Sequence, residues 1–500
     1  MLAAIKSAAV LGVEAYDVTV EVDVARGLPA WTIVGLASGA VKEARERVLA
    51  AVANSGFEVP SRRVTVNLSP ADVRKDGTGF DLPIALGLLV ATGQLPAAAT
   101  DGLLVAGELG LNGGIRPIRG VLPLAQRALR MAPRALVVPE GNAAEAALVG
   151  ITCVSCAPTL AVLVAALRNG GPPPASRVAH VGAAPEPAPD LADVVGQPVA
   201  RRALEIAAAG RHNILFTGPP GTGKTMLARR LPGILPPLSE GELHEVIAVH
   251  SVGGLLVPGT LPSRTAPFRA PHHTISLAGL IGGGPGPRPG EVSLAHRGVL
   301  FLDELLELPR HVLDAMRQPL EDGRVVIARA ANAVAFPARF QLVGATNPCP
   351  CGLSGAGSAC ICSAADIARY RARLSGPLAD RIDIHAHVGV VPTSALDAPN
   401  AAEASATVRE RVAGARELQL ARGTTANAGV NADADARWLL RHGEFTPAAR
   451  SLLLDAANRM CLSARAYHRT LRVARTIADL DRAAIVADAA VAEALRYRRS

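Results

Sequence analysis

Aromatic residues are scarce in this 500-residue chain, where Phe, Trp and Tyr together make up 3% of the sequence. Aliphatic side chains and alanine must therefore fill the core. The length predicts about three domains and leaves ample material for a large core.

Lysine is also scarce, since only Lys6, Lys42, Lys75 and Lys224 among the 51 basic residues are lysine. The net charge of +8 and the pI of about 9.4 permit a polyanionic partner. The skew toward arginine and alanine equally fits a genome-wide compositional bias, which weakens that argument. It makes Lys224 more informative, because a compact ammonium group beside phosphates has a role that arginine fills poorly.

We expect neither a signal peptide nor a membrane span. Glu14 ends the short apolar run that starts at Met1. Residues 146–167 are uncharged and long enough to consider as a span, but a strand over Ile151–Cys156 and a helix that begins near Pro158 explain them better. We expect a soluble, cytoplasmic protein whose cysteines stay reduced.

The most informative stretch is Gly-Pro-Pro-Gly-Thr-Gly-Lys-Thr at residues 218–225, which fits the phosphate-loop pattern. The sequence predicts a buried strand before it, over residues 213–217, and a helix after it, over 226–231. Backbone N–H groups of such a loop and the helix N-terminus bind phosphate oxygens. We expect Lys224 to neutralise the β- and γ-phosphates of ATP and Thr225 to bind Mg²⁺. The nucleotide-binding residues predicted in this segment are Gly218, Pro219, Pro220, Gly221, Thr222, Gly223, Lys224, Thr225 and Met226.

Two later strands end in polar residues suited to triphosphate hydrolysis. Residues 298–302 are apolar and are followed by Asp303 and Glu304. In a doubly wound sheet such carboxylates lie beside the phosphate loop, so we expect Asp303 to hold Mg²⁺ through water and Glu304 to polarise the attacking water. Residues 341–346 predict the next strand, and Asn347 at its end is a candidate to orient that water.

Two arginines are candidates for contact with the triphosphate. Arg381 stands at a predicted helix end, and in ring ATPases such an arginine reaches the γ-phosphate bound by the neighbouring subunit. An ordinary ion pair with a nearby aspartate is the alternative. Arg465, Arg469 and Arg472 share one face of a C-terminal helix by their spacing. A helical lid that closes over the nucleotide commonly brings an arginine to the phosphates, so we expect Arg469 to reach them. The alternative is a solvated basic face.

Composition divides the chain into a first unit, a Pro/Gly-rich linker, a module with the phosphate loop and a helical region, at residues 1–168, 169–190, 191–392 and 393–500. Gly196 and Gln197 lie ahead of a helix predicted over residues 200–209. Segments in this position commonly border the adenine, so both are candidate nucleotide contacts.

Two segments of the first unit, one of them at residues 75–83, resemble the peptidase domain of Lon-type proteases. The nucleophile and base positions hold Gly79 and Leu122 instead, so an activated nucleophile is missing. We expect a Lon-like fold without the Ser–Lys dyad, in which Lys75 and Asp76 are solvated turn residues.

Two insertions distinguish the module. Residues 253–290 are Gly/Pro-rich and contain Arg-Ala-Pro-His-His-Thr at 269–274. Adjacent histidines without further ligands make poor metal sites, so we expect a loop that contacts a partner. Residues 323–336 predict a hairpin, whose Arg324 and Arg329 are candidates for contact with DNA phosphates.

Four of the seven cysteines lie within fourteen positions, at Cys349, Cys351, Cys360 and Cys362. Two Cys-x-Cys pairs with a glycine-containing spacer suit a four-thiolate Zn²⁺ site, and reduced thiols without metal are the alternative. Cys153 and Cys156 lie in an apolar stretch without a second pair and are expected to be small buried hydrophobes.

Together these motifs resemble the bacterial Mg-chelatase-like AAA+ family typified by ComM, also called YifB. The strings at residues 269–274 and 347–352 are the most specific, and the resemblance covers nearly the whole chain. It implies an α/β architecture with a Lon-like (ribosomal S5 domain 2-like) α+β domain, a phosphate-loop AAA+ core and a C-terminal helical lid. It also implies a hexameric ring that uses ATP and Mg²⁺ to drive branch migration of DNA.

Two other functions compete with this one. A chelatase-type ATPase subunit shares the core and would drive Mg²⁺ insertion into a porphyrin through a partner, but the sequence offers no tetrapyrrole site. A non-enzymatic scaffold is disfavoured by the intact hydrolysis motifs at Lys224, Asp303, Glu304 and Asn347.

Overall fold

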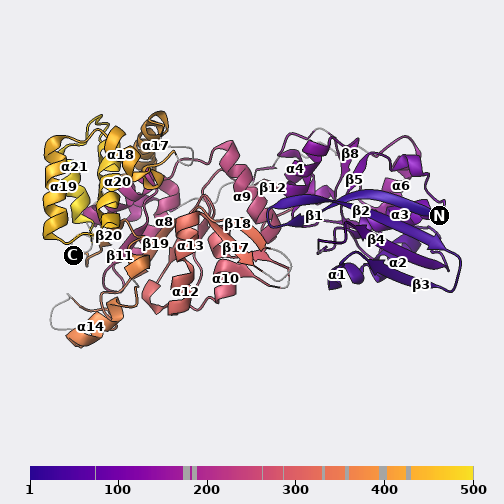
Figure 1. Ribbon diagram of the computed structural model, residues 1–500, viewed down its shortest axis with the longest axis horizontal. Coiled ribbons are helices and arrows are strands. Elements are labelled where there is room, and N and C mark those ends of the chain that lie inside the picture. Colours follow the sequence, from indigo (N-terminus) through magenta and orange to yellow (C-terminus); the bar gives the residue numbers. More distant parts are fainter. Residues whose placement is uncertain are drawn as a thin grey trace.

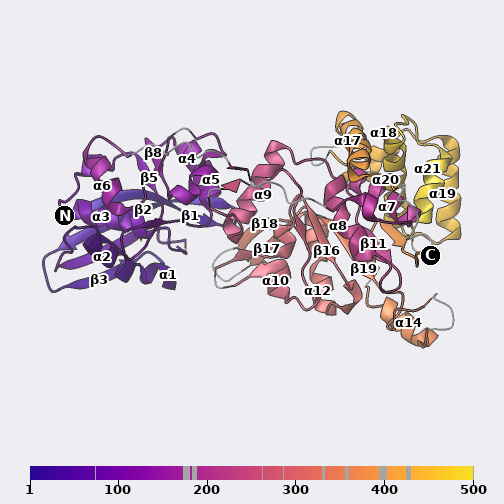
Figure 2. The same ribbon diagram turned by 180° about the vertical axis from the view of Figure 1, so that it is seen from behind.

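The computed structural model of the chain describes residues 1–73, 75–151, 153–172, 181–182, 189–258, 260–261, 263–284, 286–328, 333–354, 360–374, 376–392, 402–423 and 429–498. The molecule is elongated, with the first unit at one end and the C-terminal helices at the other (Figures 1 and 2). Most of the predicted linker and Arg329 of the predicted hairpin lie outside the described residues.

The first unit is built on a seven-stranded mixed sheet of order β3-β4-β2-β1-β5-β8-β9. Its strands are β1 (Leu2–Leu11), β2 (Glu14–Ala25), β3 (Ala30–Val34), β4 (Arg63–Ser69), β5 (Leu103–Val105), β8 (Ala135–Val137) and β9 (Val154–Ser155). Valines alternate with polar residues along β2, so one face of that strand is buried. Its longer helices are α2 (Ala44–Asn54), α3 (Asp81–Ala91), α4 (Val121–Met131) and α6 (Leu160–Arg168). The wholly buried α3 packs against β1 and β2.

Smaller elements complete this unit: α1 (Gly39–Lys42), β6 (Glu108–Leu109), β7 (Ile115–Arg116) and α5 (Ala143–Ala147). The expectation that Lys75 is solvated is wrong. Its main chain pairs with Leu36 and Ser38, which draws the side chain under the surface and leaves it 0% exposed. Asp76 is exposed as expected.

The apolar stretch considered as a membrane span divides into the short strand β9 and the helix α6, whose first turn is capped by Thr159. Among the described residues, none of the helices has the length and apolar character that crossing a bilayer requires. Cys156 is buried, and burial raises the pKa of its thiol to about 12, whereas Cys153 is only half-buried.

The central module contains a five-stranded parallel sheet of order β13-β16-β19-β11-β20. Its strands are β13 (Phe268–Arg269), β16 (Val299–Leu302), β19 (Gln341–Thr346), β11 (Ile214–Thr217) and β20 (Ile384–His387). Every residue of β16 and β19 is buried, as expected for strands covered on both faces. Because β11 lies between β19 and β20, the chain winds to both sides of it and opens a crevice at its carboxyl end.

Helices and short strands surround this sheet: α7 (Pro198–Gly210), α8 (Lys224–Ile234), α9 (Glu240–Gly253), β12 (Thr260–Leu261), α10 (Leu277–Ile281), β14 (Gly282–Gly283), β15 (Arg288–Pro289), α11 (Glu291–Leu294), α12 (Arg310–Ala315), α13 (Arg317–Asp322), α14 (Ala364–Arg371) and α15 (Gly376–Ala379). β10 (Val181–Gly182) pairs with β12. The predicted hairpin is present as β17 (Arg324–Ala328) and β18 (Ala333–Pro337).

The C-terminal region consists of α17 (Ser405–Ala421), α18 (Ala436–His442), α19 (Pro447–Arg459), α20 (Ala464–Leu480) and α21 (Asp488–Arg496). α20 packs against both α17 and α7, and its buried residues share one hydrophobic core with β11 and β20. The C-terminal helices are therefore joined firmly to one edge of the central sheet.

A buried carboxylate joins the first unit to α9. Glu145 Oε1 accepts a hydrogen bond from the backbone N–H of Leu122 at 2.8 Å and another from the Ser251 hydroxyl. Leu122, Ile247 and Ala248 form a small apolar cluster beside it. Burial raises the pKa of Glu145, although the hydrogen bonds from Ser251, Leu122 and Asn142 oppose the rise.

Candidate nucleotide site

The predicted strand, loop and helix around residues 218–225 are present as β11, the loop and α8. Glycine is required at position 218, because a Cβ there would lie 2.0 Å from the carbonyl oxygen of Val388. Gly223 immediately precedes α8 with a φ of +92°, in the left-handed region that favours glycine. The loop thus delivers the N-terminus of an eleven-residue helix to the carboxyl end of β11.

Lys224 is folded back over this loop. Its Nζ donates to the carbonyl oxygens of Gly218 at 2.6 Å and Pro219 at 2.7 Å, and to Asn347 Oδ1 at 3.2 Å. Burial lowers the pKa of the Lys224 amine, and the negative charges of Asp303 and Glu304 partly offset this. The closest partners of the ammonium group are neutral oxygens, so an anion in the loop would gain a strong electrostatic contact.

A hydroxyl and a carboxylate meet next to the loop. Thr225 Oγ1 donates to Asp303 Oδ2 at 2.7 Å, and Asp303 Oδ1 accepts from the backbone N–H of Glu304 at 3.0 Å. Hydroxyl and carboxylate oxygens of this kind are the ligands that Mg²⁺ prefers. The candidate hydrolysis residues from β11, β16 and β19 therefore converge at one edge of the sheet.

Glu304 has an unexpected neighbour. His273 Nδ1 lies 3.1 Å from Glu304 Oε2, so the paired histidines of the first insertion reach the crevice. The rings of His272 and His273 are 4.1 Å apart. Sequence reasoning singled out these histidines but missed this contact, because nothing in local spacing relates residue 273 to residue 304.

A cleft of about 370 Å³ lies beside the loop and is lined mainly by apolar residues such as Val199, Val390 and Val391. Gln197 Nε2 donates to the carbonyl oxygens of Gly389 at 2.6 Å and Thr222 at 3.4 Å. Gly196 also lines this cleft. The arrangement offers a flat base a hydrophobic slot next to the phosphate loop.

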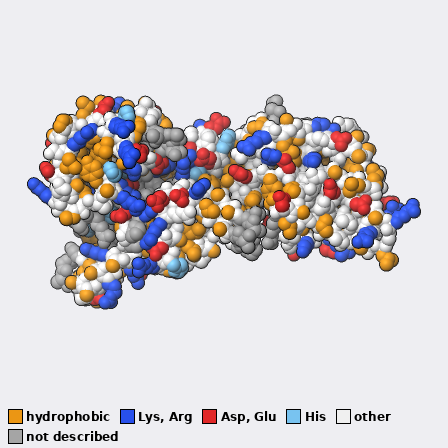
Figure 3. Space-filling model, viewed as in Figure 1, with side chains coloured by type: hydrophobic (Ala, Val, Ile, Leu, Met, Phe, Trp, Pro, Cys, Tyr) orange, Lys and Arg blue, Asp and Glu red, His pale blue; other side chains and the backbone are white. Residues whose placement is uncertain are grey.

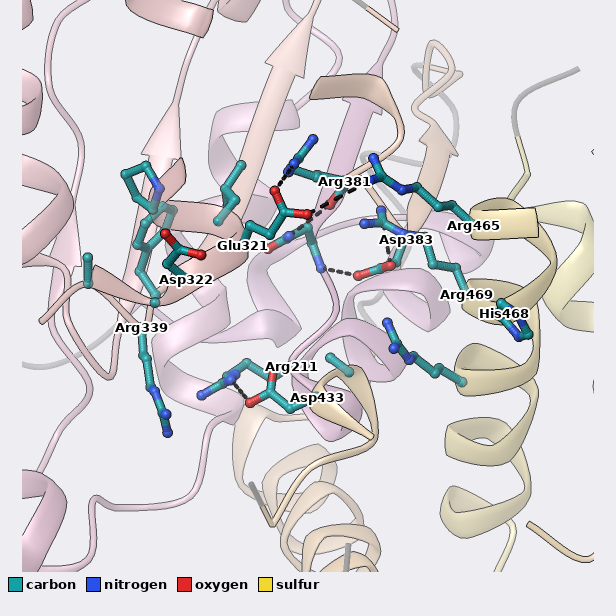
Figure 4. A pocket seen from close by; sticks show the side chains of 18 of the residues that line it. Arg211, Glu321, Asp322, Arg339, Arg381, Asp383, Asp433, Arg465, His468 and Arg469 are labelled. Atoms are coloured by element: carbon teal, nitrogen blue, oxygen red, sulfur yellow. Dashed lines mark hydrogen bonds and ion pairs between the residues drawn. The ribbon is translucent and has the colours of Figure 1, made fainter. Parts of the chain in front are cut away.

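The two candidate arginines lie elsewhere. Arg381 and Arg469 both line a cavity of about 550 Å³ at the amino ends of β11, β19 and β20. Figure 4 shows them facing the same space from the strand side and from α20. Arg465 and Arg472 line it too, so the predicted shared helical face is confirmed.

Ion pairs fix these side chains. Arg381 pairs with Glu321, which also lies 3.8 Å from Arg465. Arg469 Nη1 is 3.4 Å from Asp383 Oδ1. Burial alone would raise the pKa of Asp383, but its contacts with His212 and with the guanidinium group of Arg469 lower it.

This arginine cavity lies at the amino ends of the parallel strands, whereas the phosphate loop lies at their carboxyl ends. β11 separates them by four residues, or about 13 Å at roughly 3.3 Å per residue. Both guanidinium groups pair with carboxylates in this cavity. The structure therefore does not place Arg469 at the phosphate loop of its own chain, contrary to what a lid closing over the nucleotide would give.

The four clustered cysteines come together, with their Sγ atoms all within 4.8 Å of one another. Of the predicted DNA contacts, Arg324 opens β17 and is exposed. On the face in Figure 3, basic and acidic side chains are interspersed over the described surface rather than separated into one broad basic area.

Three family models match the chain. They are described as "Magnesium chelatase, subunit ChlI" over residues 190–396, "Subunit ChlI of Mg-chelatase" over residues 20–142 and "Magnesium chelatase, subunit ChlI C-terminal" over residues 402–498.

Curated relatives extend over the full length. The competence protein ComM of Haemophilus influenzae is 45% identical over 99% of this chain and 97% of its own length. YifB of Salmonella typhimurium is 43% identical with the same coverage. The magnesium-chelatase 38 kDa subunit of Rhodobacter capsulatus is 30% identical over 33% of this chain and 52% of its own length.

Proposed function

The chain belongs to the magnesium-chelatase-like family that includes ComM and YifB, and on that premise we propose that it is an ATP-hydrolysing AAA+ ring motor that remodels DNA. Its proposed task is branch migration, or a related helicase activity, during recombination or natural transformation. The name of the Haemophilus relative, a competence protein, supports this task.

One observation carries the ATPase part of the proposal. Two hydrogen-bonded pairs, Lys224 with Asn347 and Thr225 with Asp303, lie at the carboxyl ends of the parallel strands, and Glu304 directly follows Asp303. Thr225 and Asp303 would hold Mg²⁺, which supplies positive charge at the phosphates when bound.

In this proposal each remaining residue has a separate task. Lys224 binds the β- and γ-phosphates, and Glu304 orients and polarises the attacking water. Asn347 helps to align that water, and the apolar slot beside Gly196 and Gln197 takes the adenine. The chain's own groups thus supply positioning and electrostatic stabilisation, which dominate catalysis of phosphoryl transfer.

The arginines complete the site from a neighbouring subunit. Arg381 and Arg469 line one cavity on the edge of the sheet away from the phosphate loop, which supports a head-to-tail ring in which this edge faces the loop of the next chain. We propose a hexamer. Pairing with Glu321 and Asp383 would hold the two guanidinium groups ready for that contact.

A chelatase-type ATPase subunit is the second candidate, favoured by the descriptions of the three family models. The chelatase subunit of Rhodobacter covers only a third of this chain, whereas ComM covers nearly all of it. Turnover that requires a porphyrin-binding partner would support the chelatase function, and turnover stimulated by DNA would support the motor.

Glu304→Gln tests the assignment of the hydrolysis residue. The variant should bind ATP as the unaltered protein does but turn it over at a rate lower by about 10²-fold or more, because the amide cannot polarise water. The matched control is Glu307→Gln, an exposed acid three residues further on that pairs with Arg373. Normal turnover by Glu304→Gln would remove Glu304 from the mechanism.

A further inference from the structure

The four clustered cysteines approach one another from two short segments of the chain. Cys349 and Cys351 follow β19, and Cys360 and Cys362 lie just ahead of α14. Cys349 Sγ is 3.3 Å from Cys351 Sγ and 3.8 Å from Cys360 Sγ, and Cys351 Sγ is 3.7 Å from Cys360 Sγ. All four cysteines are free thiols that point toward a common centre.

The separations among Cys349, Cys351 and Cys360 are close to those around one tetrahedral metal ion, and Cys362 Sγ lies within 4.8 Å of the other three. Zinc–sulfur bonds of about 2.3 Å place the sulfur atoms of a tetrahedron about 3.8 Å apart. A multi-iron cluster would hold its thiolates further apart. An S₄ ligand set of this size favours Zn²⁺ among the common divalent ions. We propose that Cys349, Cys351, Cys360 and Cys362 bind one structural zinc ion.

The surrounding backbone supports a thiolate site. The N–H of Ser354 donates to Cys349 Sγ at 3.2 Å. Such hydrogen bonds stabilise the negative charge of metal-bound sulfur and orient it. Cys349 is buried and the other three are half-buried, so the site is closed on one side by the protein.

The position of the site gives it a role beyond local folding. Cys349 lies two residues after Asn347, the residue whose amide oxygen accepts from Lys224. On the other side, Gly352 packs against the phosphate loop: a Cβ there would lie 2.8 Å from the ring of Pro220. The segment that carries the cysteines therefore packs directly against the phosphate loop.

The ion would also anchor α14. Ser363 caps this helix through a reciprocal pair of hydrogen bonds with Asp366, and it directly follows Cys362. Figure 1 shows α14 projecting from the body of the molecule. Arg371 at its end donates to the carbonyl oxygen of Pro348 at 3.4 Å, so α14 and the Asn347 loop share one support.

We infer from these contacts that zinc binding holds Asn347 against Lys224 and keeps Gly352 packed against Pro220 of the phosphate loop. This second part of the inference depends on the proposed ATPase function, whereas the metal site does not. Loss of the ion should lower turnover by about tenfold or more, as is typical when supporting ligands of a site are removed.

The test measures metal and turnover separately. Full-length protein purified without a metal-affinity tag should contain about one zinc per chain by elemental analysis. The double variant Cys360→Ser/Cys362→Ser should lose it, whereas the control Cys461→Ser, which alters an exposed cysteine that is not part of the cluster, should keep it. Zinc absent from the unaltered protein, retained by the double variant, or replaced by iron would overturn the proposal.

A second measurement covers the case in which the double variant fails to fold. Unaltered protein stripped by a chelator and loaded with Co²⁺ should develop the visible and sulfur-to-metal absorption of a tetrahedral tetrathiolate site. An octahedral cobalt spectrum would count against the site. If the protein holds zinc but never hydrolyses ATP, the metal site survives and only the proposed function fails.

Discussion

Arg381→Ala should abolish ATP turnover without abolishing ATP binding, and a partner variant should restore activity. Arg381 lines a cavity at the amino ends of the parallel strands. The length of β11, about 13 Å, separates this cavity from the phosphate loop of the same chain. If Arg381 takes part in hydrolysis, as we propose, it acts on a nucleotide held by another subunit.

Two magnitudes separate a catalytic effect from a structural one. An arginine supplied by a neighbour accelerates hydrolysis by about 10³–10⁵-fold, or roughly 4–7 kcal/mol. Arg381 loses its ion pair with Glu321, whose side chain is 56% exposed, so that pair contributes about 1 kcal/mol. Arg381 itself is buried, so the substitution also removes the packing of its side chain. Turnover should therefore fall by several orders of magnitude, whereas thermal stability should fall only moderately. Arg369→Ala, which removes an arginine with an 82% exposed side chain, controls for the loss of one positive charge.

Mixing distinguishes a shared site from a damaged one. Lys224→Ala subunits cannot bind ATP but keep Arg381, and Arg381→Ala subunits have the opposite defect. In a ring assembled at random from equal amounts of the two variants, about a quarter of the subunit interfaces combine an intact Lys224 with an intact Arg381. Steady-state ATPase assays should show the mixture well above both parents. If the subunits exchange and the ATPase activity of the mixture equals the mean of the two variants, Arg381 does not act across a subunit interface.

Two further predictions concern contacts between segments. Burial raises the pKa of Glu145 above its usual 4.5, so its ionisation opposes folding, and its contribution to stability is lost as pH rises from 4.5 through the raised pKa. Glu145→Gln should remove this pH dependence from the melting temperature, and an unchanged profile would contradict the burial argument. His273→Ala should lower kcat about fivefold with KM unchanged, since it removes a half-exposed contact with the Glu304 carboxylate that contributes about 1 kcal/mol. His272→Ala is the control, and equal effects of the two substitutions would contradict a specific role for His273.

Local patterns predicted the elements that carry the site. The apolar runs before the phosphate loop, Asp303 and Asn347 are strands, because strands covered by helices on both faces need continuous apolar sequence. Residues that end such parallel strands must meet at one edge of the sheet. For this reason the convergence of Lys224, Asp303 and Asn347 followed from motif order alone.

Contacts between segments far apart in the chain could not be predicted from local sequence patterns. That Arg381 and Arg469 share a cavity depends on strand order and on how α20 packs, which spacing along the chain does not specify. The contact of His273 with Glu304 depends on the path of a Gly/Pro-rich insertion without a regular period. The burial of Lys75 depends on pairing with Leu36 and Ser38, almost forty residues earlier in the chain.

The most direct test of the central claim is ATP hydrolysis by the purified full-length chain without DNA, with single-stranded DNA and with branched DNA. A motor driven by ATP should hydrolyse faster with DNA, and the stimulation should weaken as salt screens the phosphate contacts. Hydrolysis that is the same with and without every DNA, at low salt and with assembled subunits, would contradict the account.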